Sequence, residues 1–135
     1  MEIREFLEAD QVAVISLWNV CGLVVPWNDP AEDIERKLKV NPDLFLVGHD
    51  ANELVATVMG GYDGHRGWIN YLAVKPSSQR NGYGQEIMKA VEARLKRRGC
   101  PKINLQIRAR NAGVAAFYEA IGYGTDDVIG MGKRL

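Results

Sequence analysis

The segment Leu72–Gly84, with the sequence LAVKPSSQRNGYG, carries the strongest fold signal in this chain. An apolar strand pattern over Trp68–Val74 leads into it, and a helical pattern over Gly82–Arg98 follows. A helix N-terminus presents unpaired N–H groups and a partial positive charge, so it suits an anion. Glycines at 82 and 84 remove side chains that would keep a phosphate from the backbone. The segment predicts a site for a phosphate-bearing ligand.

Two common phosphate motifs are absent from this segment. A Walker loop needs Gly-Lys followed by Ser or Thr, and the dinucleotide fingerprint needs Gly-x-Gly-x-x-Gly after a first strand. The pattern present is Gln79-x-x-Gly82-x-Gly84, preceded by Leu72-x-Val74-x-Pro76. Taken alone, it fits a tight turn with glycines used only for geometry as well as it fits an anion site.

Length and composition indicate one ordinary globular domain, residues 1–135. Lys plus Arg and Asp plus Glu are both 17, so no basic field for nucleic acid is expected. No apolar run approaches the ~20 residues of a membrane span, and the polar start Met1–Glu5 does not resemble a signal peptide. Cys21 and Cys100 lack metal spacing and are interpreted as free thiols in a reducing cytoplasm.

The periodicity predicts the element order β-α-α-β-β-β-α-β-α-β, a mixed α/β sheet with helices on both faces. A glycine-rich loop is expected over Gly60–Gly67, and one or two further strands over Tyr123–Leu135. The other predicted strands are Ile3–Phe6, Leu44–Gly48, Leu54–Met59, Trp68–Val74 and Ile103–Arg108. The predicted helices are Asp10–Cys21, one that starts at Asp29-Pro30 and ends before Asn41, Gly82–Arg98 and Asn111–Ile121.

The longer pattern resembles the central motif of the GNAT superfamily, the Gcn5-related N-acetyltransferases. A second block, Asn111–Tyr123 with the sequence NAGVAAFYEAIGY, resembles the last helix of that family. The resemblance covers nearly the whole chain and implies a mostly antiparallel sheet with a splayed central strand pair. Three further stretches, Pro26–Pro30, Thr57–Gly67 and Arg98–Ile103, are similar to a bacterial YpeA-type branch.

The resemblance implies that acetyl-CoA is the acyl donor. By analogy, Leu72, Ala73 and Val74 contact pantetheine and acetyl through main-chain atoms. The residues expected around the pyrophosphate are Gln79, Arg80, Asn81, Gly82, Tyr83 and Gly84. For Arg80, a solvated surface position is an equal alternative.

Two residues of the second block have implied roles. Asn111 is expected to cap the last helix, and the matching residue of the family also often bonds the cofactor arm. Tyr118 lies beside the apolar stripe Val114, Phe117 and Ile121, and in many family members the matching Tyr protonates the departing thiolate. An amphipathic packing tyrosine is the alternative for Tyr118.

The general base is left unassigned. Family members often place a Glu at the positions that match Trp68 and Gln106, and neither residue can act as a base. Asp63, His65 and Tyr71, the last through water, are the remaining weak candidates. Acceptor recognition is expected from Val24–Asp29 and from Tyr62–Arg66. For Trp27, lining an acceptor pocket and covering the core are equal alternatives.

The predicted function is N-acetyl transfer from acetyl-CoA to a small-molecule or peptide amine, by direct attack in a ternary complex. The oxyanion is expected to bind a main-chain N–H near Leu72–Val74. The alternative is a non-catalytic acyl-CoA sensor of the same fold, favoured by the missing Glu. A homodimer through the last strands is a further expectation.

Overall fold

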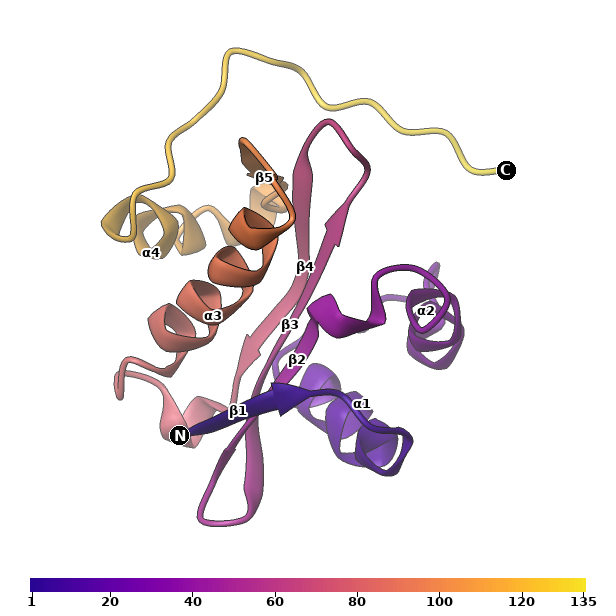
Figure 1. The fold of residues 1–135 in the computed structure, drawn as a ribbon, viewed down its shortest axis with the longest axis vertical. Coiled ribbons are helices and arrows are strands. Elements are labelled where there is room, and N and C mark those ends of the chain that lie inside the picture. Colours follow the sequence, from indigo (N-terminus) through magenta and orange to yellow (C-terminus); the bar gives the residue numbers. More distant parts are fainter. The chain divides into compact units, whose positions relative to one another are not determined.

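The computed structural model describes residues Met1–Leu135, which divide into two compact units, Met1–Leu105 and Gln106–Leu135. The first unit holds a five-stranded sheet and three α-helices (Figure 1). Its elements are β1 (Glu2–Glu5), α1 (Gln11–Val20), α2 (Pro30–Lys37), β2 (Phe45–Asp50), β3 (Glu53–Tyr62), β4 (Gly67–Val74), α3 (Tyr83–Arg97) and β5 (Ile103–Leu105). The second unit holds the helix α4 (Val114–Ala120), preceded by a 3-10 turn at Ala109–Asn111. None of the helices combines the length and apolar character needed to cross a bilayer.

The strands lie in the order β1-β2-β3-β4-β5. The first three pairings are antiparallel, and β4 with β5 is parallel. Helices α1 and α2 lie on one side of this sheet and α3 on the other (Figure 1). The predicted mixed, mostly antiparallel sheet with helices on both faces is therefore confirmed.

The face under α1 and α2 is closed by an aromatic core. Trp18 of α1 is fully buried and stacks on Phe45, with ring centroids 6.1 Å apart, and Phe45 stacks on Phe6 at 4.5 Å. Val14, Leu17 and Trp18 face the sheet, as their helical spacing predicts. Burial of these large side chains provides most of the driving force that holds α1 in place.

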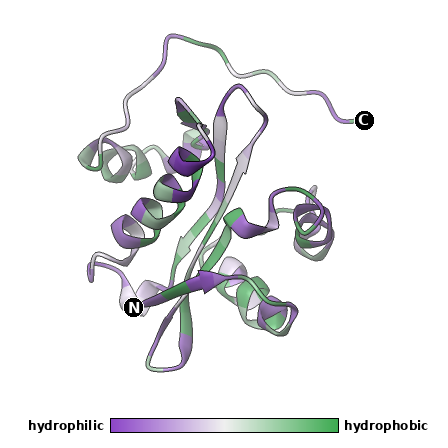
Figure 2. Ribbon diagram, in the orientation of Figure 1, coloured by the Kyte–Doolittle hydropathy of each residue, from purple (hydrophilic) through white to green (hydrophobic).

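The opposite face is covered by α3, whose buried side chains are Ile87, Met88, Val91 and Leu95. Figure 2 shows hydrophilic and hydrophobic stretches alternating along this helix, as one-sided burial requires. A Cβ built on Gly60 would lie 2.7 Å from Val91 Cγ2, closer than real contacts allow. The predicted loop over Gly60–Gly67 is therefore wrong at its start, because Gly60 is a strand residue kept small by the packing of α3.

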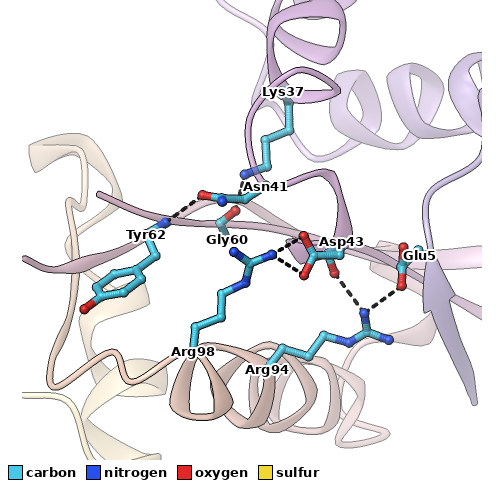
Figure 3. Close-up of polar contacts among 8 residues, drawn as sticks. All are labelled: Glu5, Lys37, Asn41, Asp43, Gly60, Tyr62, Arg94 and Arg98. Atoms are coloured by element: carbon cyan, nitrogen blue, oxygen red, sulfur yellow. Dashed lines mark hydrogen bonds and ion pairs between the residues drawn. The ribbon is translucent and has the colours of Figure 1, made fainter. Parts of the chain in front are cut away.

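Charged side chains tie α3 to the segment before β2 (Figure 3). Arg98 Nη2 donates to both carboxylate oxygens of Asp43, at 2.5 and 2.6 Å. Arg94 Nη1 donates to Glu5 Oε2 and to the Asp43 carbonyl oxygen, both at 2.9 Å. This arginine pairing lowers the pKa of the Asp43 carboxyl. The basic end of α3 thus has specific partners besides the helix dipole.

The helix ends follow the local sequence signals in most places. The Asp29 carboxylate accepts the N–H groups of Ala31 and Glu32, so it caps α2 as predicted. Gly99 and Gly122 follow α3 and α4 with φ of +84° and +103°. Those left-handed conformations favour glycine and explain why both helices end there.

Three predictions for the C-terminal part are wrong. The last strand is Ile103–Leu105 and does not extend to Arg108. Helix α4 begins at Val114 with Gly113 at its N-cap, so Asn111 lies in the preceding 3-10 turn and does not cap the helix. No strand forms over Tyr123–Leu135, where Val128, Ile129 and Met131 are exposed. Gly124, Gly130 and Gly132 interrupt this apolar run, and glycine weakens a strand.

Candidate functional site

The site begins where β4 loses one neighbour. On one side β4 pairs with β3 from Gly67 to Val74, but on the other it pairs with β5 only from Gly67 to Ile69. The segment from Asn70 to Val74 therefore has no strand partner on the β5 side. Leu72, Ala73 and Val74 lie in this segment, where the prediction placed them. An open strand edge can bind an extended ligand through main-chain hydrogen bonds.

A β-bulge marks the same segment. Thr57 pairs with Ala73 and Met59 with Asn70, so Tyr71 and Leu72 together face Val58. Tyr71 has φ of +50°, a left-handed conformation that costs a non-glycine residue about 1–3 kcal/mol. Bulges of this kind re-aim side chains and are frequent beside active sites.

Two hydrogen bonds, one buried and one part-buried, compensate for this strain. The Trp18 indole donates to Thr57 Oγ1 at 2.9 Å, and Thr57 Oγ1 donates to the Tyr71 carbonyl oxygen, also at 2.9 Å. Thr57 is fully buried. The Tyr71 ring stacks on Trp18 with centroids 3.8 Å apart. The bulge is thus held between the sheet and α1.

After β4 the chain turns into the N-terminus of α3. Arg80 and Gly82 have φ of +72° and +77°. Glu86 N–H is the first amide of α3 bonded within the helix, to Gly82 O at 3.0 Å, which leaves the preceding amides of the first turn without an intrahelical acceptor. A Cβ built on Gly82 would meet nothing within 4 Å. Gly82 therefore serves the backbone conformation and leaves open space beside these donors.

Side chains fasten this turn to its surroundings. Gln79 Nε2 donates to the Val74 carbonyl oxygen at 3.1 Å, and the Cys21 thiol donates to the same oxygen at 3.4 Å. Tyr83 Oη donates to Asp50 Oδ2 at 2.6 Å, and this bond raises the pKa of Tyr83. Arg80 and Asn81 are exposed at the tip of the turn. The open strand edge thus leads along the chain into a turn and a helix N-terminus, and such a helix start suits an anion.

The second unit carries the other two predicted site residues. Tyr118 is 9% exposed and meets Phe117 and Tyr123 edge-on, with centroids 5.2 and 5.8 Å apart. Burial raises its pKa to about 12. The phenol is therefore protonated throughout the physiological range. Asn111 lies in the 3-10 turn before α4.

The residues considered for the general base differ in their hydrogen bonds and exposure. Asp63 accepts the N–H groups of His65 and Arg66 at 2.7 Å each, and these bonds lower its pKa, so it acts as a turn residue. His65 is exposed beside Arg66. Trp68 is 37% exposed on β4. Tyr71 differs from the others because its hydroxyl donates to a carboxylate, Asp33 Oδ2, at 2.5 Å.

Sequence reasoning missed Asp33. In the sequence it is one of two acidic residues in the first turn of α2, where the helix dipole alone explains it. Only the packing of α2 beside β4 brings it to Tyr71. Trp27, expected near the acceptor, is 50% exposed between α1 and α2.

Comparisons with known proteins agree with this geometry. The model of the acetyltransferase (GNAT) family matches residues 11–123. An acetyltransferase of Pectobacterium atrosepticum is 51% identical over 135 residues, all of this chain and 96% of that protein. One of Yersinia enterocolitica is 48% identical with the same coverage. The chain belongs to the acetyltransferase (GNAT) family.

Solved structures share the fold at low identity. Aminoglycoside 6'-N-acetyltransferase AAC(6')-Ig from Acinetobacter haemolyticus aligns with a TM-score of 0.75 and 16% identity, covering 100% of this chain and 99% of that one. The ribosomal-protein-S18-alanine N-acetyltransferase from Escherichia coli aligns at 0.74 and 20%, covering 90% and 76%. One neighbour acts on a sugar antibiotic and the other on a protein. The fold therefore leaves the acceptor open, and the narrower YpeA-type branch stays a prediction.

Proposed function

We propose that this chain transfers an acetyl group from acetyl-CoA to a primary amine within a ternary complex. One observation carries the proposal: the unpaired edge of β4 leads directly into the open N-terminus of α3. A similar protein from Yersinia pestis, 48% identical, is named an N-acetyltransferase. We further propose that residues 1–135 form one catalytic domain, since the family match spans both units.

The donor side follows from the strand edge and the turn. Leu72, Ala73 and Val74 would hold the pantetheine arm and the thioester through main-chain groups, with an N–H of the same stretch for the oxyanion. Asn111 would add a side-chain bond to the arm. The Val74 carbonyl already accepts Gln79 and Cys21, so Val74 would contribute mainly through its N–H or its side chain. The residues proposed around the pyrophosphate are Gln79, Arg80, Asn81, Gly82, Tyr83 and Gly84.

The neutral acceptor amine would attack the thioester carbonyl directly, so that the C–N bond forms and the C–S bond breaks. The proton lost by the nitrogen would pass to solvent, and Tyr118 would stabilise the departing thiolate. An ordinary thiol titrates near pH 8.5, whereas the pKa of Tyr118 is about 12. Outright proton transfer would be uphill by roughly 5 kcal/mol. Tyr118 is therefore proposed to donate a hydrogen bond to the sulfur, which is stronger when the acceptor is charged. Both cysteines of the chain are free thiols, which fits the proposal of a reducing cytoplasm.

A thermal-shift titration tests the donor site. Acetyl-CoA at 100 times its Kd should stabilise the protein by about 2.7 kcal/mol through mass action. Gly82→Glu places a negative side chain in the open space beside the α3 amides and should abolish the shift. Gly99→Glu is the matched control, because Gly99 also has positive φ and nothing within 4 Å of a built Cβ. A wild-type protein that shows no shift at millimolar acetyl-CoA would contradict the proposal.

The absence of Glu at Trp68 and Gln106 favours a second candidate, a non-catalytic acyl-CoA sensor. A thioester-cleavage assay over a panel of small amines and N-terminal peptides separates the two functions. Tight acetyl-CoA binding without turnover of any acceptor would support the sensor.

A further inference from the structure

The outer edge of β1 is a row of main-chain groups without a strand partner. β1 lies at one end of the sheet and pairs only with β2. Just after β1, the Phe6 N–H donates to the Phe45 carbonyl oxygen of β2 at 2.9 Å. Because main-chain groups along an antiparallel strand point to alternate sides, Ile3 and Glu5 present theirs to the free side. These groups are available to another strand.

The helices that cover the sheet leave this edge accessible. α1 packs mainly on β3 and β4, and α3 packs mainly on β2, β3 and β4. Glu5 bonds to Arg94 of α3, so Glu5 and Ile3 point to the α3 side of β1. Glu2 and Arg4 therefore point to the opposite side. An accessible edge with this alternation is a template for strand addition.

Glu2 and Arg4 carry opposite charges on one face of β1. Glu2 is exposed, and the Arg4 side chain is 42% exposed. The Arg4 guanidinium donates to both Asp10 carboxylate oxygens at 2.7 and 2.9 Å, and to the Glu5 carbonyl oxygen at 3.0 Å. These bonds use three of the five N–H donors that a guanidinium has. Arg4 is thus fixed in position and retains donors for a second carboxylate.

A hollow borders these charges. Its volume is about 550 Å³, and its lining consists of Glu2, Ile3, Arg4, His49 and Asn52. Glu2 and His49 lie opposite each other in the register of β1 with β2, so they share one face of the sheet. The hollow has room for a long side chain that an added strand places opposite Glu2.

We infer that β1 pairs with β1 of a second copy of this chain, antiparallel about a two-fold axis at Ile3. In this register Glu2 lies opposite Arg4 of the partner subunit, and the two-fold axis repeats the pair. The two Ile3 residues exchange both their main-chain hydrogen bonds, and Glu5 N–H donates to the partner's Met1 carbonyl oxygen. One continuous sheet then runs through both subunits.

The charge pattern selects this register over its neighbours. A shift of one residue would set main-chain groups that face the free side against groups that already pair with β2. An axis at Arg4 would place the two Arg4 side chains opposite each other, and an axis at Glu2 would do the same to the two Glu2 side chains. Like charges directly opposite each other are destabilising. Since the sequence Glu2-Ile3-Arg4 complements itself, a second copy fits this edge better than an unrelated strand.

Sedimentation equilibrium from low micromolar to submillimolar protein tests the pairing. A strand pair buries less area than a standard interface, so the wild type should dimerise reversibly toward the upper concentrations. Ile3→Pro removes the N–H that faces the partner and should weaken the dimer at least about 10-fold, as expected for two lost hydrogen bonds. Proline is tolerated where a strand N–H faces solvent, so this variant should keep its acetyl-CoA thermal shift. Ile3→Val retains the N–H and should dimerise like the wild type.

A charge reversal tests the ion pairs. Glu2→Arg places like charges opposite each other in the dimer and should also weaken it at least about 10-fold. Glu35→Arg is the matched control, since it makes the same change of charge at an exposed position of α2. It should dimerise like the wild type.

A cross-link tests the register. Directly opposite residues that exchange both hydrogen bonds have Cα atoms about 5.5 Å apart, within the range of a disulfide. Oxidation of Ile3→Cys should therefore link two subunits through the introduced thiols. Glu5→Cys should not link them, because the two residues 5 are not opposite each other. Peptide mass spectrometry distinguishes this link from one through Cys21 or Cys100.

A wild type that stays monomeric throughout the range, or an Ile3→Pro protein that dimerises equally well, would overturn the inference. A dimer that is lost in Ile129→Asp and retained in Ile3→Pro would overturn it in favour of contacts through the C-terminal segment. The thioester assay decides the proposed function separately, because β2 and β3 separate β1 from β4 and its open edge.

Discussion

At the scale of single residues, Tyr118 shows how an environment changes the role of a side chain. Residue type alone suggests that the pKa of the Tyr118 phenol is close to the pKa of a thiol. Burial raises the pKa of Tyr118 to about 12 and removes that match, while it keeps the hydroxyl protonated. Because of the same burial, the free energy of unfolding changes with pH in the alkaline range. The neutral phenol stabilises the folded state fully below pH 10, and this stabilisation is lost as the pH rises through 12.

Tyr118→Phe removes this hydroxyl and keeps the ring contacts with Phe117 and Tyr123. We expect kcat to fall by roughly 10²-fold, in the range of a lost transition-state hydrogen bond. The acetyl-CoA thermal shift should stay within about 1 °C of wild type. Tyr123→Phe, a neighbouring tyrosine, should keep full turnover. Equal kcat in wild type and Tyr118→Phe would remove Tyr118 from the mechanism.

At the scale of elements, the bulged strand β4 organises the site. The bulge turns Tyr71 toward Asp33, and the short pairing with β5 leaves one edge of β4 without a strand partner after Ile69. Thr57 is the element's main support, since its hydroxyl links the Trp18 indole to the Tyr71 carbonyl. The strained φ of Tyr71 persists because these bonds and the Trp18 ring hold it.

Thr57→Val is nearly isosteric and deletes only this bridging hydroxyl. It leaves a buried indole N–H without an acceptor, which costs about 1–3 kcal/mol. We expect the free energy of unfolding in urea to fall by that amount. Thr57→Ser retains the hydroxyl and should keep the Trp18 indole hydrogen-bonded, even if the lost methyl lowers stability. A Thr57→Val protein as stable as wild type would show that the bridge is not needed.

At the scale of the whole molecule, a buried lysine makes stability depend on pH. Lys37 Nζ donates to the Gly60 carbonyl oxygen (Figure 3). Burial, with a smaller contribution from Arg98, lowers its pKa from 10.5 to about 8, although Asp43 opposes the shift. Below pH 8 the folded state bears the cost of a buried ammonium. Above pH 10.5 both states are neutral and the cost disappears, so stability rises between these values.

Lys37→Met should abolish this dependence. Between pH 7 and 9.5 the wild-type free energy of unfolding should rise by about 1–2 kcal/mol relative to Lys37→Met, after allowance for solvent screening. This window ends before Tyr118 begins to titrate. Urea unfolding at three pH values measures the difference. Lys39→Met removes an exposed charge from the same region, and its free energy of unfolding should change with pH as that of the wild type does. Parallel curves for wild type and Lys37→Met would contradict a buried, destabilised ammonium.

Local sequence signals were enough to predict most of the elements around Leu72–Gly84. Apolar periodicity located α1, α3 and the strands, and Asp29, Gly82, Gly99 and Gly122 marked where helices begin and end, because such signals depend on neighbours within one turn. The strand-turn-helix over Leu72–Gly84 was predictable for the same reason. The C-terminal strands were predicted wrongly, since an apolar run forms a strand only when a partner strand pairs with it.

Two features of the fold depend on segments that are distant in the sequence. In the sequence, Gly60 cannot be distinguished from a loop glycine, and only the packing of Val91 against it explains the residue. Asp33 is an ordinary acidic residue of a first helical turn until α2 packs beside the bulge of β4 and brings its carboxylate to Tyr71, 38 residues away in the chain. Contacts of that kind depend on which distant surfaces bury each other, and no local pattern records them.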